Sequence, residues 1–96
     1  MRVTFNELAE RELNDAAQFY EHERSGLGAA FIVEVRRCTA AVVEHPQSSP
    51  VVLGSIRRRL CQRFPYALLY TVAGAELRIL AVMNLKRRPG YWVGRT

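Results

Sequence analysis

Apolar residues recur at helical spacing in two long segments of the N-terminal half. In residues 7–23 and again in residues 27–44 they lie three or four positions apart, and polar residues fill the opposite side. This spacing predicts two amphipathic helices. The apolar positions are Leu8, Ala9, Leu13, Ala16, Ala17 and Tyr20 in the first segment, and Leu27, Phe31, Val35, Cys38 and Val42 in the second.

Local signals place the ends of these helices. Thr4 with Glu7 fits a capping box, and Asn6 is the competing N-cap residue. The stretch 25–28 contains two glycines, which permit a tight reversal, so we expect an antiparallel helical hairpin. Pro46 stops the second helix, and residues 46–50 read as a loop.

The remaining segments read as strands. Residues 3–5 form a short candidate strand, residues 56–64 alternate loosely, and residues 66–72 are the continuous apolar run of a central strand. A further strand spans 76–83 after a turn at 73–75, and short loops make neighbours antiparallel. We therefore predict one α+β domain, residues 1–96, in the order β-α-α-β-β-β, with the helical hairpin packed on one face of a small twisted antiparallel sheet.

Arginines cluster in the first long strand of this predicted sheet. Alternation puts Arg57, Arg59 and Arg63 on one face, with Arg78 on a nearby strand, and we expect this face to be free of the helices. Guanidinium groups in such an array suit phosphate oxygens. The alternative is a set of surface arginines that keeps a sheet edge soluble, and Arg58 breaks the alternation.

The charge of the chain is unevenly distributed. Residues 1–56 hold five Lys or Arg against eight Asp or Glu, a net charge of −3, whereas residues 57–96 hold nine against one, a net charge of +8. This asymmetry favours an anionic partner for the C-terminal half, either nucleic acid or an acidic protein segment. A solvated basic surface without a partner is the alternative.

A second basic patch lies near the C-terminus, where Lys86, Arg87 and Arg88 precede Tyr91 and Trp92. Basic residues beside aromatic ones suit a phosphate backbone and a stacked base. Aromatic residues at a chain end more often pack down and anchor it. We expect Trp92 to be that anchor and Tyr91 to be the more exposed of the two.

Other kinds of site find little support. Cys38 and Cys61 form no CxxC pair, and His22 and His45 are not at ligand spacing from either, so we expect no metal and no cofactor. No Ser/His/Asp set is present, and the basic half contains a single carboxylate. No apolar run is long enough to span a membrane, and the N-terminus has no signal-peptide core, so we expect a cytoplasmic protein.

Several segments, in order along nearly the whole chain, resemble the RelE/ParE superfamily of toxins from type II toxin–antitoxin systems, and the C-terminal one favours the ParE-like branch. They are Phe19-Tyr20-Glu21, Gly26-Leu27-Gly28 with Phe31, Pro46, Ile56-Arg57, Phe64-Pro65-Tyr66, Ile79-Leu80-Ala81-Val82 and Arg87-Arg88-Pro89-Gly90-Tyr91-Trp92.

This resemblance implies a protein partner. Members are encoded beside an antitoxin, here ParD-like or similar, which wraps around the toxin and neutralises it. The complex contacts operator DNA only through the antitoxin. The RelE-like branch cleaves messenger RNA on the ribosome, whereas the ParE-like branch poisons DNA gyrase. We expect an amphipathic antitoxin helix in the grooves beside the hairpin and an acidic antitoxin tail on the basic sheet face.

Residue by residue, the nuclease pattern is incomplete. Ala67 stands where nucleases place an arginine after the tyrosine, and Asn84 stands where many have a histidine. The resemblance thus favours a gyrase inhibitor that is not an enzyme. The alternatives are a ribosome-dependent mRNA endonuclease and an inactive relative that only binds its antitoxin. The nuclease would use Arg57, Arg59, Arg63, Arg78 and Tyr91.

Overall fold

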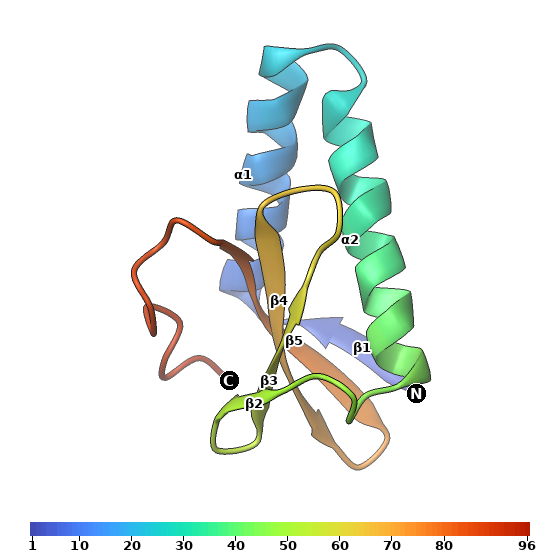
Figure 1. Cartoon of the computed structure of the whole chain (residues 1–96), viewed down its shortest axis with the longest axis vertical. Coiled ribbons are helices and arrows are strands. Elements are labelled where there is room, and N and C mark those ends of the chain that lie inside the picture. Colours follow the sequence, from blue (N-terminus) through green and yellow to red (C-terminus); the bar gives the residue numbers. More distant parts are fainter.

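A computed structural model describes residues 1–96 as two helices and five strands (Figure 1). The helices α1 (Glu7–Glu23) and α2 (Leu27–Glu44) lie side by side as an antiparallel hairpin. Neither is long and apolar enough to cross a membrane. The predicted α+β architecture, a helical hairpin packed on a small sheet, is confirmed. The strands are β1 (Arg2–Phe5), β2 (Val51–Leu53), β3 (Ile56–Leu60), β4 (Tyr66–Ala73) and β5 (Glu76–Asn84).

The five strands form one mixed sheet in the order β1-β5-β4-β3-β2. Strands β2 to β5 are antiparallel neighbours, and this arrangement was predicted for β3, β4 and β5. Strand β1 is the exception, because it lies parallel to β5 with Val3 opposite Leu77. The prediction of a wholly antiparallel sheet was wrong at this edge. A short loop makes two consecutive strands antiparallel. Both helices and three strands separate β1 from β5 along the chain, so no loop length predicts the direction of this pair.

The strand β3 ends earlier than predicted. It stops at Leu60 rather than at residue 64, and β2 is an additional short strand at the edge. The Glu34 carboxylate on α2 accepts the backbone N–H groups of Gln62 and Arg63, at 2.7 and 3.2 Å. These bonds turn the chain after Leu60 toward α2. No alternation of apolar residues encodes such a contact.

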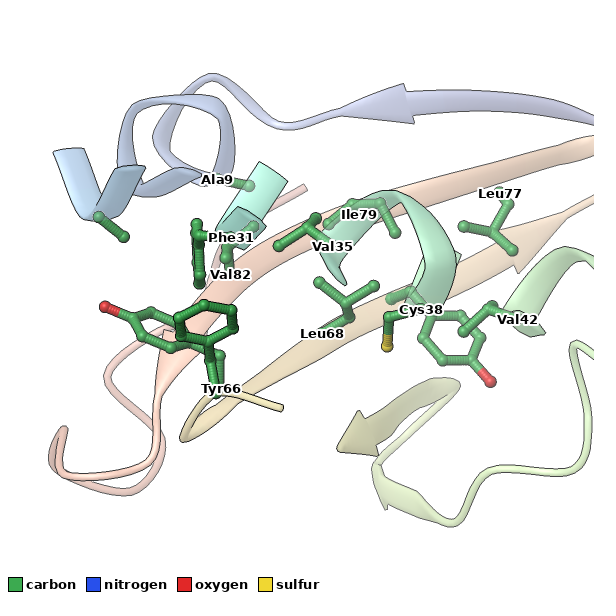
Figure 2. Packing of buried hydrophobic residues seen from close by; sticks show 13 residues of the cluster. Ala9, Phe31, Val35, Cys38, Val42, Tyr66, Leu68, Leu77, Ile79 and Val82 are labelled. Atoms are coloured by element: carbon green, nitrogen blue, oxygen red, sulfur yellow. The ribbon is translucent and has the colours of Figure 1, made fainter. Parts of the chain in front are cut away.

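The core lies between the helices and one face of the sheet (Figure 2). Tyr66, Leu68 and Tyr70 of β4 point toward the helices, whereas the alternate residues Ala67 and Leu69 point to the other face, which we call the open face. The largest buried side chains of the helix-facing cluster come from α2, β4 and β5: Phe31, Val35, Cys38, Val42, Leu68, Tyr70, Leu77, Ile79 and Val82.

Side chains satisfy the backbone at the N-terminal ends of the helices. Asn6 is the N-cap of α1, and its side chain accepts the N–H groups of Leu8 and Ala9 at 2.7 and 3.4 Å. Of the two predicted caps, Asn6 is therefore the one used. The N-cap of α2 is Gly26, with φ of +88° and no side chain to cap the helix. The Glu21 carboxylate of α1 accepts the N–H of this glycine instead.

Candidate functional site

The arginines of β3 do not share one face. In the antiparallel pairing Arg57 lies opposite Tyr70 and Arg59 opposite Leu68, and both partners belong to the helix-facing core. Arg58 lies opposite Leu69, which belongs to the open face. Side chains of directly paired residues point to the same side of a sheet. The prediction that Arg57 and Arg59 project from the free face was wrong.

Arg57 supports the loop that precedes β2. Its Nη1 donates to the backbone carbonyl oxygens of Gln47 and Ser49, at 3.2 and 2.7 Å. Both carbonyls belong to the segment between α2 and β2, so Arg57 already has structural partners. Arg59 is half-buried on the side of α2 that carries Cys38, and no hydrogen bond engages its guanidinium.

Arg63 lies beyond the strand, in the loop that Glu34 holds. Its guanidinium carbon is 5.6 Å from the centre of the Phe64 ring. Glu34 is 5% exposed and also pairs with Arg37, whose Nη2 is 2.6 Å from Oε2. The hydrogen bonds from Arg37 and from the loop backbone lower the Glu34 pKa to about 2, despite its burial. Arg63 is thus set apart from the β3 arginines, contrary to the prediction.

Arg78 is on the open face, across the sheet from the helices. It lies opposite Thr71 on β4 and opposite Thr4 on β1. Its two terminal nitrogens donate to the backbone oxygens of Phe5 and Thr96, at 3.0 and 3.4 Å. Arg78 therefore ties the C-terminus to the β1 edge, and the sheet separates it from the helix-side arginines of β3.

The last residues of the chain are fastened to α1 by an ion pair. Arg95 donates from both terminal nitrogens to the two oxygens of Glu12, at 2.9 and 3.1 Å. The Tyr91 hydroxyl donates to the same carboxylate at 2.6 Å, and Glu12 also accepts the N–H of Val82. We call this arrangement of Glu12, Tyr91 and Arg95 the clasp.

Tyr91 is accordingly engaged and only half-exposed. Its burial, together with the hydrogen bond to the Glu12 carboxylate, raises its pKa well above the usual range. The Arg87 guanidinium stacks on the same ring, with its carbon 4.0 Å from the ring centre. At neutral pH the phenol is a protonated donor whose acceptor is already in place.

Trp92 anchors the C-terminal segment, as predicted. It is 6% exposed and packs on the open face with Leu69 and Met83. This segment therefore covers part of the face that was expected to be free. The basic residues of the turn after β5 remain exposed: Lys86, Arg87 and Arg88.

Glu12 and Glu34 were missed by the sequence analysis, although a signal was present. Each stands within an apolar helical stripe, Glu12 between Ala9 and Ala16 and Glu34 four positions before Cys38. A carboxylate at such a position needs donors nearby, because burying an unpaired charge is costly. The donors to Glu12 come from β5 and the C-terminal segment, and those to Glu34 come from the loop after β3 and from Arg37 on the same helix. Of these donors, only Arg37 lies at a spacing that the sequence reveals.

The fold and these surfaces define a class of small basic α+β proteins. A solved structure described as "Chromosomal ParDE TA system from P. aeruginosa" contains a chain of the same fold, with a TM-score of 0.65 and 18% identity. The match covers 88% of this chain and 95% of that chain. No curated protein sequence matches.

A family model resolves the class further. The model for the ParE toxin of type II toxin–antitoxin system, parDE, matches residues 3–89. This chain belongs to the ParE toxin family, in agreement with the branch that the C-terminal motif favoured.

Proposed function

We propose that this chain is a cytoplasmic toxin of one domain, residues 1–96, that blocks growth by poisoning DNA gyrase and is neutralised by a cognate antitoxin. Membership of the ParE family supports the toxin and the antitoxin. The observation that favours gyrase over messenger RNA is the scatter of the candidate nuclease side chains. Arg57 and Arg59 lie on the helix side of the sheet, and Arg78 lies on the open face.

RNA cleavage needs groups that move a proton and groups that stabilise charge at one phosphate. The only tyrosine among the candidates, Tyr91, donates to Glu12 and keeps its proton at neutral pH. Glu12 in turn is paired with Arg95. A substrate would have to break the clasp before either group could act, so the arrangement supports a binding protein.

The exposed basic turn is our candidate for target contact. Lys86, Arg87 and Arg88 lie together on a segment that the clasp and Trp92 hold in place. Exposed cations on an anchored loop suit the phosphates of gyrase-bound DNA. In the neutralised state we expect an acidic segment of the antitoxin to offset part of the positive charge, with operator DNA contacted by the antitoxin alone.

A supercoiling assay tests the gyrase target. Relaxed plasmid, gyrase and ATP are incubated with the purified chain, and linear DNA is scored after detergent and protease treatment. We expect supercoiling to be lost and linear DNA to accumulate, and both effects to disappear when the antitoxin is added. A soluble, folded chain that leaves gyrase untouched but cleaves ribosome-bound messenger RNA would establish the alternative enzyme.

A matched pair of variants tests the basic turn. Arg88→Glu reverses a charge in the turn, and Arg24→Glu makes the same change at an exposed position near the tip of the helical hairpin. We expect Arg88→Glu to need about tenfold more protein for the same linear DNA, with little change for Arg24→Glu. Equal loss in both variants would show that net charge, and not the turn, is responsible.

A further inference from the structure

The last strand of the sheet presents an apolar edge. Strand β2 ends the strand order, so no strand covers its outer side. Its three residues Val51, Val52 and Leu53 are 51%, 39% and 49% exposed, and none of them is charged. Native proteins usually protect a free edge with charge, proline, a covering segment, a bulge or a very short strand, and β2 has the last two, since it is three residues long with a register shift against β3. These features leave its apolar side chains exposed, and together the side chains indicate a surface that contacts another segment.

The same edge opens into a groove on the open face. The groove has a volume of about 410 Å³ and runs between β2 and the C-terminal segment. Its floor is the apolar patch that also seats Trp92. We call it the edge groove, and its lining residues are Val52, Leu53, Arg58, Leu69, Met83, Pro89, Gly90, Trp92 and Val93.

The charge around the edge groove selects the occupant. Arg58 is the one charged residue in the lining, it is exposed, and no acidic side chain pairs with it. The basic turn reaches the groove through Pro89 and Gly90. A second copy of this chain would bring like charges together, which is unfavourable. A segment with a carboxylate beside apolar residues complements both the charge and the lining.

We propose that the edge groove binds an extended, mostly apolar segment of the antitoxin, added as a further strand beside β2, with an acidic side chain paired to Arg58. A strand satisfies the open backbone groups of the edge, whereas a helix leaves them to water. This inference rests on the proposed function, because the antitoxin supplies the occupant.

The test measures binding of the purified antitoxin to variants of the whole chain. Val52→Asn removes apolar surface from the groove, and Val33→Asn makes the same change at a position on α2 that is 62% exposed. Arg58→Glu reverses the charge, and Arg58→Lys keeps it. We expect Kd to rise about tenfold for Val52→Asn and for Arg58→Glu, the latter in a salt-dependent way. Val33→Asn and Arg58→Lys stay within about threefold of the parent chain.

Hydrogen exchange on the parent chain gives a second readout, which needs no variant. The backbone amides of residues 51–53 exchange more slowly in the complex than in the free chain if a strand is added there. Unchanged exchange at β2, together with unchanged Kd for Val52→Asn, overturns the proposal. Slow exchange in the free chain at high concentration, lost on dilution, assigns the groove to a second copy and also overturns it.

The outcomes separate this inference from the proposed function. If the parent chain forms no complex with the antitoxin, the proposed function is wrong, and the edge groove cannot bind an antitoxin segment. If the parent complex forms and the groove variants bind as tightly, only the edge groove is wrong. Gyrase poisoning by the free chain is read in a separate assay and does not involve the antitoxin.

Discussion

Glu12 on α1 and Arg95 at the end of the chain form a two-point ion pair across 83 positions of sequence. Their side chains are 17% and 12% exposed, so water screens the pair only weakly. Arg95 also donates to the carbonyl of Leu80 at 3.1 Å. The pair therefore holds together α1, β5 and the C-terminal segment that carries the basic turn.

Removing one charge of this pair should destabilise the protein. We expect Glu12→Gln to lower the free energy of unfolding by about 2 kcal/mol, because the Arg95 guanidinium stays partly buried without its counter-ion. Urea unfolding measures this loss, and faster amide exchange in residues 91–95 localises it. The control is Glu10→Gln, an exposed carboxylate on the same helix, with a change within about 0.5 kcal/mol. Equal stability of both variants would contradict the role of the clasp.

A buried carboxylate makes stability depend on pH. The pKa of Glu34 falls from 4.5 to about 2 on folding, so the folded state favours the charged form. Its contribution is complete above pH 4.5 and is lost as the pH falls toward 2, for a total of about 3 kcal/mol. Urea unfolding from pH 7 to pH 2.5 should show the stability gap between the parent chain and Glu34→Gln closing below pH 4.5. A gap that stays constant over this range would sink the assignment.

A close approach between the helices requires glycine at position 28. A Cβ built on Gly28 lies 2.5 Å from the carbonyl oxygen of Ala17, which is backbone and has little room to move. We expect Gly28→Ala to cost about 2 kcal/mol or more, although alanine normally stabilises a helix relative to glycine. Thermal unfolding gives the sign. The reverse change at the exposed neighbour, Ala29→Gly, should cost about 1 kcal/mol from helix propensity alone.

The elements that the sequence predicted well are those whose signal is local. The helices follow from spacing of three and four, and the central strand β4 follows from a continuous apolar run. Strand β1 was predicted with the wrong direction, since its partner β5 lies at the other end of the chain. The early end of β3 depends on Glu34, which binds the backbone of two residues that lie 28 and 29 positions further along the chain.

The candidate site was predicted less well than the fold, for a related reason. Alternation gives two faces to a strand but does not say which face the helices cover. For β3 the covered face is the one that carries Arg57 and Arg59. Tyr91 was chosen for its place beside the basic turn, yet its hydroxyl is bound to Glu12 on a distant helix. The charge distribution predicted a basic C-terminal half correctly. Which of its arginines form internal hydrogen bonds depends on tertiary contacts that the sequence does not show.

The two arginines on the helix side of β3 should therefore behave differently. Arg57 donates to two loop carbonyls, so Arg57→Ala leaves both unpaired and should cost about 1–2 kcal/mol in urea unfolding. Arg59 makes no such bond, so Arg59→Ala should change stability by less than about 0.5 kcal/mol. Under the gyrase proposal we expect the Arg59→Ala chain to remain as toxic as its parent. An mRNA endonuclease that uses Arg59 would lose its toxicity on this substitution while staying folded. That result would contradict the gyrase proposal and favour RNA cleavage.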